Sequence, residues 1–387
     1  MTISHWQVTV PDVTFGPGSV KHTLDLLKQQ GLSRPMLVTD AGVLTQPFTK
    51  ALIAQLEANH FLVSTFSEIK GNPTKSNVDL GVEYLQSANS DSIIALGGGS
   101  AIDVAKAMSL VARNKKDLWL FCYFEDPDTL PQLSASDDFV PMMIIPTTAG
   151  TGSELSGSSC VITDEVRGQK RVAYHPSHFP FAVIADPELL ISLPKHLSAW
   201  TGMDALTHAI EAYCAPDFNP LCDGIALEAV RLCYEHLSES VNSIDLLPGR
   251  TQMMAASSIA AVAFTSKGLG AVHSIAHALG ALLDIHHGLA NAVVLPYVLK
   301  FNLSVIAPKL TRLANLLALP DRTAKGFIAW IEELRQQLAI PNTLKEIHVK
   351  PEQLPHIAAL AYKDTEHQTN PVTMSEANFL HILKTAF

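Results

Sequence analysis

The sequence predicts an α/β domain over residues 1–190 followed by an all-α domain over residues 191–387. In the first half of the 387-residue chain, short apolar segments alternate with helical ones, which is typical of a parallel sheet with helices on both faces. From residue 194 onward the segments become long, rich in alanine and leucine, and periodic at helical spacing. A chain of this length also has room for two hydrophobic cores.

The individual elements are predicted from apolar runs and the turns that end them. We expect strands at residues 6–10, 36–39, 61–66, 92–96, 142–145 and 181–184, with a hairpin at 161–163 and 171–174. Between the strands we expect helices at residues 19–30, 44–58, 76–88 and 101–112. No strand signal follows residue 190. The second domain is expected to contain helices at residues 198–213, 221–240, 250–265, 267–282, 288–300, 304–316, 322–337, 351–362 and 374–385.

The net charge and the cysteine content indicate which partners and which cellular compartment to expect. The net charge is −10 and neither lysine nor arginine clusters, which argues against a nucleic-acid or anionic-membrane partner. The five cysteines include no CxxC pair and fit free thiols in a reducing cytosol. The start lacks the features of a signal peptide, and the longest small-apolar stretch, near residues 253–264, is too short to span a bilayer. We therefore expect a soluble, cytoplasmic protein.

The second domain holds a spaced set of one aspartate and five histidines, namely Asp204, His208, His273, His277, His286 and His287. The first two are four residues apart, and so are the next two. On a helix this spacing places both members of a pair on one face. Three imidazoles and one carboxylate brought together in this way would bind a divalent transition metal and leave room for a substrate oxygen.

A single histidine is more often a partly buried, hydrogen-bonded residue than a metal ligand. Here the neighbours of both pairs are mostly apolar or small, such as Leu206 and Ile275. An uncompensated carboxylate buried among such residues is costly, and a cation is the simplest compensation. We therefore interpret the set as a catalytic metal site.

Two loops of the first domain are candidates for binding a dinucleotide. Residues 97–100 (GGGS) lie between a strand and a helix N-terminus, where glycines let the backbone approach a pyrophosphate and free amides attract its charge. Residues 146–154 (PTTAGTGSE) follow another strand and would form a second phosphate cradle at the same sheet edge. Each loop alone is a weak signal, because a tight strand-to-helix turn has the same composition and the GxGxxG pattern is absent.

Two aspartates near these loops have a functional and an ordinary interpretation. Asp40 follows a strand, where an acid can accept bonds from an adenosine ribose and repel a 2′-phosphate; this favours NAD over NADP, although a turn aspartate is equally common there. Asp103 lies in the first turn of the helix after GGGS, where it also stabilises the positive helix end.

Several motifs along the chain point to one known family. They are FGPGS, GGGSAIDVAKA, IPTTAGTGSE, TGMDALTHAIEAY, GAVHSIAHALGALLDIHHGLANAVVLP and, after these, Phe301-Asn302. In this order and spacing they resemble the iron-containing (group III) alcohol dehydrogenases over essentially the whole chain. The resemblance implies a dinucleotide-binding domain, a helical domain of the kind also found in dehydroquinate synthase, and an active site in the cleft between them. It further implies Fe²⁺, NAD, a small alcohol or aldehyde substrate and a homo-oligomer.

The resemblance also implies roles for individual residues. The family's metal ligands fall on Asp204, His208, His273 and His287. His277 matches a histidine that lies near the substrate and helps to move the proton, whereas His286 stands where relatives commonly have another residue. Cofactor contacts fall on Asp40, Asn72, Gly98, Gly99, Ser100, Asp103, Thr147, Thr148 and Lys170.

Two departures from the family pattern leave the substrate open. Residues 155–160 (LSGSSC) form a segment one residue longer than expected, and Val372 stands where arginine is common. In the main interpretation the metal acts as a Lewis acid on the alcohol or aldehyde oxygen, and NAD exchanges the hydride with the substrate carbon.

The same residues are compatible with other functions. The ligand set would accept zinc as readily as iron, so a polyol (glycerol-like) dehydrogenase using zinc is one alternative. A non-redox lyase of the dehydroquinate synthase type is another, but it needs several basic residues for a phosphorylated substrate, and few besides Lys267 lie near the histidines. A metallohydrolase, which would use the metal to activate water, leaves the two loops unexplained. A non-catalytic, metal-stabilised scaffold would not need an open cleft.

Overall fold

The computed structural model describes residues 6, 8–122, 125, 128, 130–133, 138–243 and 245–387. The chain divides into two compact units. The α/β unit comprises Thr9–Thr148 and Ser153–Ser192. The helical unit comprises Leu193–Phe387, the short segment Ala149–Gly152 and the described residues of Met1–Val8.

The α/β unit is built on a six-stranded parallel sheet. Its strands, in spatial order, are β1 (Val13–Phe15), β8 (Ala182–Ala185), β5 (Met142–Pro146), β4 (Ser92–Gly97), β2 (Pro35–Val38) and β3 (Ser64–Phe66). The helices are α1 (Thr23–Gln29), α2 (Ala41–Leu44), α3 (Pro47–Ala58), α4 (Lys75–Ser87) and α5 (Gly99–Val111). A separate antiparallel hairpin joins β6 (Cys160–Asp164) and β7 (Gln169–Ala173).

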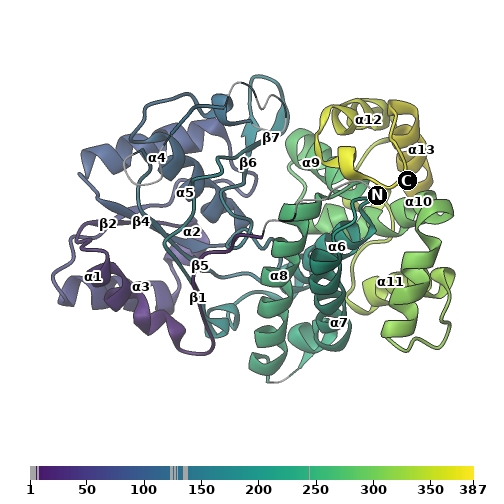
Figure 1. Cartoon of the computed structure of the whole chain (residues 1–387), viewed down its shortest axis with the longest axis horizontal. Coiled ribbons are helices and arrows are strands. Elements are labelled where there is room, and N and C mark those ends of the chain that lie inside the picture. The colour runs from purple at the N-terminus through teal and green to yellow at the C-terminus, as the bar shows by residue number, and fades with distance from the viewer. Residues whose placement is uncertain are drawn as a thin grey trace. The chain divides into compact units, whose positions relative to one another are not determined.

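The central strands of this sheet are buried on both faces. Leu37, Ile94 and Ile145 belong to one apolar cluster with Leu27 of α1 and Leu56 of α3. Successive strand side chains point to opposite faces, so the alternate residues of the same strands lie on the face where α4 and α5 pack. Figure 1 shows these two pairs of helices on either side of the sheet. Together with the helical unit, this arrangement confirms the predicted fold class.

The first strand lies later in the chain than the sequence indicated. The prediction placed it at residues 6–10, of which residue 7 lies outside the described part, whereas β1 is Val13–Phe15 and pairs with β8. Trp6 has another partner, because its Nε1 donates to the carbonyl of Phe218 at 3.0 Å and the two rings lie 5.9 Å apart. Its side chain thus packs in the helical unit instead of extending the sheet.

The helical unit contains eight described α-helices. They are α6 (Lys195–Cys214), α7 (Pro220–Asn242), α8 (Leu247–Lys267), α9 (Ala271–Leu283), α10 (His287–Leu316), α11 (Ala324–Gln337), α12 (Leu354–Lys363) and α13 (Glu376–Ala386). Helices α6, α7 and α8 pack on one another, and α10 packs on α6, α9 and α11. Helix α8 ends at Lys267 because Gly268 takes a φ of +79°.

Helix α10 is longer than the two helices predicted at residues 288–300 and 304–316. Asn302 does not end the helix, because its side chain is buried and pairs with Asn370. By length and composition α10 could cross a membrane, as could α8 and α9 if their sharply bent pair were one span. However, 61% of the apolar window of α10 is buried, as in a core helix.

The segment Ala149–Gly152 belongs to the helical unit although the sequence interpretation placed it before the domain boundary. A Cβ added at Gly150 would lie 2.6 Å from the backbone oxygen of Thr201 on α6. At Gly152 it would lie 2.8 Å from the carbonyl of Ser257 on α8. These two glycines let the loop pack directly against helix backbones.

Candidate functional site

Asp204 and His208 lie one turn apart on α6 and are almost fully buried. Helix α6 is rich in alanine and other small or apolar residues, which favour a helix, and the i, i+4 spacing places both side chains on one face. The Nε2 atom of His208 lies 3.9 Å from Oδ1 of Asp204. This is too long for a hydrogen bond and suits two atoms that share a third partner.

Two other helices each place one histidine near the carboxylate of Asp204. His273 is the third residue of α9 and His287 is the first residue of α10. Their Nε2 atoms lie 3.8 and 3.7 Å from Oδ1 of Asp204. The candidate ligand atoms of all four residues lie within 4.8 Å of one another, so the structure brings together the four residues predicted as metal ligands.

Hydrogen bonds orient two of these imidazoles. The Nδ1 atom of His208 lies 3.2 Å from the carbonyl oxygen of Gly150, and Nδ1 of His273 lies 2.6 Å from Oε2 of Glu211. Both partners can only accept in these contacts, so each Nδ1 carries the hydrogen. In the neutral imidazole the lone pair of Nε2 then faces Asp204, which is the tautomer that a metal ligand requires.

Asn291 on α10 lies among the same atoms. Its Nδ2 donates to Oδ1 of Asp204 at 2.6 Å and lies 3.1 Å from Nε2 of His273 and 3.2 Å from Nε2 of His287. Its buried Oδ1 has no partner among the described residues. The carboxylate of Asp204 and the three imidazoles around it form a donor set that fits a divalent cation.

The electrostatics of the centre agree with that composition. Burial alone would raise the pKa of Asp204, but the nearby imidazoles of His208 and His287 lower it, so the carboxylate is charged. Burial lowers the pKa of His208 to about 4, which keeps it neutral. Burial also disfavours charge on His273, but hydrogen bonds to Asp204 and Glu211 raise its pKa to about 10. Without a cation, a proton on His273 balances the negative charges of Asp204 and Glu211; a bound cation would take over that role.

His277 stands beside this cluster and is not part of it. Its ring lies 6.3 Å from that of His273 and stacks at 5.3 Å on that of His287. Its Nδ1 donates to Oδ2 of Asp364 at 2.8 Å, and Ser274 donates to the other oxygen at the same distance. His277 therefore presents Nε2 as its proton-accepting atom.

Three partners of these histidines were not predicted. Glu211 lies seven residues after Asp204, on the same face of α6, and this spacing was the available signal. Asn291 follows His287 by four residues and offered a similar signal. Asp364 lies 87 residues from His277, and no local pattern marks it. His286 lies outside the cluster, with its ring 5.1 Å from that of Trp200.

In the α/β unit, the two predicted cofactor loops adjoin. Strand β4 ends at Gly97 and α5 begins at Gly99, with Gly98 as its N-cap. A Cβ at Gly98 would lie 3.1 Å from Cγ2 of Thr148, and the amide of Thr147 donates to the carbonyl of Gly97 at 2.9 Å. Gly98 thus lets the second loop pack closely against the N-terminus of α5, where backbone amides could bind a phosphate.

The other residues predicted to contact the cofactor surround these loops. Ser100 donates to the carbonyl of Gly71 at 2.5 Å, which places the loop holding Asn72 next to α5. Asp40 caps α2 through Oδ1, and its Oδ2 would lie 3.7 Å from a Cβ at Gly97. Lys170 lies on β7, opposite Thr163.

Asp103 is committed to contacts inside the α/β unit. Ser153 donates to its Oδ1 at 2.5 Å and the amide of Val161 donates to its Oδ2 at 3.0 Å. Burial raises its pKa against the opposing charge of Lys106. Lys106, which was not predicted, is fully buried and donates to Ser156 and to the carbonyl of Ser159. These two residues hold the long serine-rich segment against α5.

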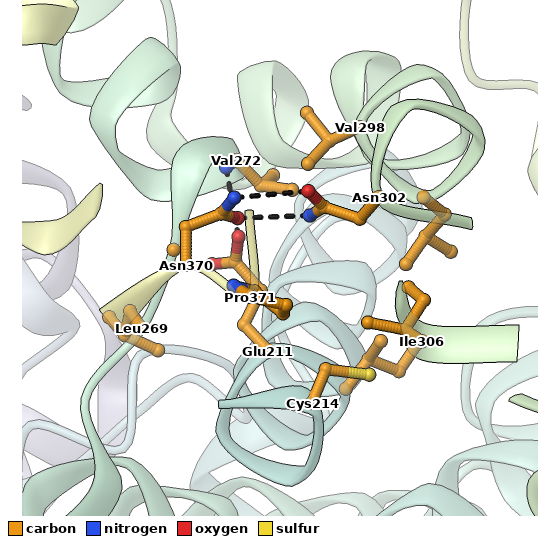
Figure 2. A pocket seen from close by; sticks show the side chains of 12 residues that line it. Glu211, Cys214, Leu269, Val272, Val298, Asn302, Ile306, Asn370 and Pro371 are labelled. Carbon is orange, nitrogen blue, oxygen red and sulfur yellow. Dashed lines mark hydrogen bonds between the residues drawn. The ribbon is translucent and has the colours of Figure 1, made fainter. Parts of the chain in front are cut away.

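The second departure from the family pattern, near Val372, follows an amide pair. Asn302 and Asn370 exchange two hydrogen bonds of 2.9 and 3.0 Å, and Nδ2 of Asn370 also donates to the carbonyl of Val372. Figure 2 shows this pair at the wall of a pocket lined in part by Glu211 and Leu269. The cavity measures about 10 Å³, which is the room of a single water molecule.

Comparison with known proteins places the whole chain among related sequences. Residues 11–187 match the family described as iron-containing alcohol dehydrogenase, and residues 198–387 match the Fe-containing alcohol dehydrogenase family, C-terminal. A 4-hydroxybutyrate dehydrogenase of Cupriavidus necator is 34% identical, over 93% of this chain and 95% of its own.

Two further relatives are similar over nearly their full length. An NAD-dependent methanol dehydrogenase of Bacillus methanolicus is 34% identical, over 97% of this chain and 98% of its own. The crystal structure of a 1,3-propanediol oxidoreductase superposes with a TM-score of 0.91 at 33% identity, over 99% of this chain and 100% of that one.

Proposed function

The chain belongs to the iron-containing alcohol dehydrogenase family, and from this premise we propose that it is an NAD- and Fe²⁺-dependent dehydrogenase of a small primary alcohol. The observation that carries the proposal is the cluster of Asp204, His208, His273 and His287. The reaction class itself, oxidoreduction of an alcohol, follows from the family. The cofactors, the substrate and the residue roles are proposals.

The four clustered side chains would hold the cation, which when bound supplies a Lewis acid for the alcohol or aldehyde oxygen. Its identity as Fe²⁺ is supported by the family, since the ligands would bind zinc as well. His277 is proposed as the catalytic base. With Nδ1 held by Asp364, its Nε2 accepts the proton of the alcohol hydroxyl, and it returns that proton in the reverse reaction.

NAD is proposed as the hydride acceptor because of the loops in the α/β unit. Backbone amides at Gly98, Gly99 and Ser100 would bind the pyrophosphate at the N-terminus of α5. Thr147, Thr148, Asn72 and Lys170 are assigned to the surrounding contacts, and Asp103 to fixing the loop. Oδ2 of Asp40 would accept a ribose hydroxyl and repel a 2′-phosphate, so NADP is the weaker cofactor.

The substrate class is supported by what the relatives are named for. Methanol, 1,3-propanediol and 4-hydroxybutyrate are small molecules whose hydroxyl is bound to a terminal, unbranched carbon. We therefore propose a small primary alcohol or its aldehyde, and we also propose a soluble, cytoplasmic homo-oligomer without a nucleic-acid or membrane partner.

The lyase alternative is disfavoured by the contacts of two buried or half-buried lysines of the helical unit, Lys267 and Lys309. Lys267 binds Asp223, and Lys309 donates to the carbonyls of Tyr213 and Ala215 at 2.7 and 3.0 Å. Both side chains thus form their polar contacts near the C-terminal end of α6. Neither is placed to bind a phosphorylated substrate at the histidines.

The proposal is tested by measuring NAD reduction by the purified protein with methanol, 1,3-propanediol, 4-hydroxybutyrate and glycerol. Each assay is run as purified, after chelation, and after adding back Fe²⁺ or Zn²⁺. We expect turnover of a primary alcohol that is lost on chelation and restored best by Fe²⁺. Preference for glycerol with zinc would favour the polyol alternative, and undiminished turnover after chelation would overturn the metal requirement.

A further inference from the structure

Glu211 on α6 holds two parts of α9 at once. Its Oε2 accepts the Nδ1 hydrogen of His273 at 2.6 Å, and its Oε1 accepts the backbone N–H of Val272 at 2.8 Å. The residue is buried, with 7% of its surface exposed. One carboxylate therefore fixes both the imidazole and the helix turn from which that imidazole projects.

The N-terminus of α9 depends on side chains from elsewhere in the helical unit. Its N-cap is Gly270, which has no side chain to bond the first amides. Oδ1 of Asn370 accepts from Ala271 at 3.2 Å, while Glu211 accepts from Val272. A Cβ at Gly270 would lie 2.7 Å from Oε1 of Glu211, so the glycine leaves the acid room to reach the helix. Figure 2 shows Glu211, Val272 and Asn370 grouped around this point.

We propose that Glu211 is a positioning residue that prepares His273 to bind the metal. Because Nδ1 of His273 donates to this carboxylate, the orientation of the ring is fixed, and Nε2 is the atom that would bind a cation in place of its proton. That atom lies 3.8 Å from Oδ1 of Asp204, across the candidate centre. Carboxylates bonded to ligand imidazoles in this way fix the tautomer and raise the basicity of the coordinating nitrogen. The inference rests on the proposed function, since it supposes that the four residues bind a divalent cation.

The competing role for Glu211 is that of a helix cap alone. The two roles predict different effects when Glu211 loses one acceptor oxygen. A cap contributes to the stability of α9 whether or not metal is bound, whereas a positioning residue contributes to metal affinity. Asn370 provides a matched control, because it caps the adjacent amide of the same helix and does not contact His273.

The experiment compares wild type, Glu211→Gln and Asn370→Ser as full-length proteins freed of metal by chelation. The probe is Co²⁺, followed by its visible absorption, with Kd measured by competition against a chelator of known affinity. The Tm of each metal-free protein is measured in parallel. In Glu211→Gln we expect Kd to rise roughly tenfold to hundredfold, with an altered Co²⁺ spectrum. In Asn370→Ser we expect a lower Tm with an unchanged Kd and spectrum.

Equal Kd values and identical spectra for wild type and Glu211→Gln would overturn the inference while leaving the proposed function standing. Failure of wild type to bind Co²⁺ would instead overturn the proposed metal site and the inference with it. Gly270→Ala provides a second route if the glutamine variant does not fold, because the added Cβ displaces the carboxylate and keeps its charge. The same rise in Kd is expected there, and an unchanged Kd would count against the proposal.

Discussion

The two units of this protein present their functional groups in different ways. In the helical unit, side chains from three helices converge until four candidate ligand atoms lie within 4.8 Å. In the α/β unit, the predicted cofactor residues mainly offer backbone at strand ends, and the side chains of Ser100 and Asp103 are already bonded within the unit. A metal site is thus defined by side-chain chemistry, whereas a phosphate site is defined by the absence of side chains.

That difference means that substitutions in the two units should have separable effects. A lost ligand removes one donor of a small set, and nothing else on the same helix can replace it. A lost contact in a cofactor loop removes one hydrogen bond among many. Changes in the helical unit should therefore act on turnover and metal content, and changes in the α/β unit on cofactor affinity.

The largest effect is expected from His208→Ala. This change removes one of the four candidate ligands, so the variant should lose its metal and with it a Lewis acid worth several kcal/mol, or roughly three orders of magnitude in kcat. Metal content and kcat are measured together, and NADH binding is followed by fluorescence titration. NADH affinity within about twofold of wild type would support the separation of the two units, whereas full metal content would argue that His208 is not a ligand.

His277→Ala should lower kcat by about 100-fold near neutral pH, because general acid–base catalysis contributes on that order. Metal content should remain close to that of wild type, since the ring of His277 lies outside the ligand cluster. Asp364→Asn is the companion variant and should give a smaller loss, because it keeps a hydrogen-bonding group at Nδ1. Full activity of His277→Ala would exclude its role as the base.

The sequence predicted the candidate metal ligands but not the residues that bond to them. Helical spacing predicted that Asp204 and His208 share one face, as do His273 and His277. The family resemblance then selected Asp204, His208, His273 and His287 as the ligands, and His277 lies outside that cluster. Glu211 and Asp364 were missed because their contacts with His273 and His277 depend on how distant helices pack. The spacing of Glu211 from Asp204 was visible, but nothing in it indicated that the first turn of α9 would pack against this face.

The fold itself was predictable wherever local pattern and burial agree. The central strands β4 and β5 are continuous apolar runs that end in glycine- or threonine-rich loops, and both formed near the predicted residues. The first strand was misplaced because WQVTV has strand composition, but pairing with β8 occurs at Val13–Phe15. Likewise α10 continues through Asn302, because a partner more than sixty residues away satisfies that side chain.

Asp40→Ser should show a smaller effect, confined to the cofactor. Serine keeps the cap of α2, since it can accept from the amides of Gly42 and Val43, but it removes the charge. We expect kcat/KM for NAD to fall roughly tenfold to hundredfold, as for the loss of a hydrogen bond to a charged group, and NADP to be used better than by wild type.

Asp117→Ser is the matched control, because Asp117 caps another short helix of the same unit through Trp119. The control should leave kcat/KM for both cofactors unchanged. If the ratio of kcat/KM for NAD to that for NADP were unchanged in Asp40→Ser, the only role of Asp40 would be to cap α2.

The smallest effect is expected on stability in acid, and it should arise in the α/β unit through His178. Ser109 donates its hydrogen to the carbonyl of Val140 at 2.6 Å, so Nε2 of His178 must donate to Ser109 at 2.8 Å. The buried Nδ1 has no partner among the described residues, and a proton there would be unsatisfied. Burial, followed by the charges of Lys106 and His175, lowers the pKa of His178 from its ordinary 6.5 to about 3.

As the pH falls below 6.5 the unfolded chain takes up this proton and the folded chain does not, so stability is lost between about pH 6.5 and 3. For a shift of this size the loss at pH 5 is about 2 kcal/mol, and there is none above pH 7. Urea unfolding at pH 7 and pH 5 should show a loss in His178→Gln, whose amide can still donate to Ser109, that is smaller than in wild type by about this amount. His22→Gln, at an exposed histidine of the same unit, should unfold like wild type at both pH values. Parallel losses in all three proteins would show that acid sensitivity is not located at His178.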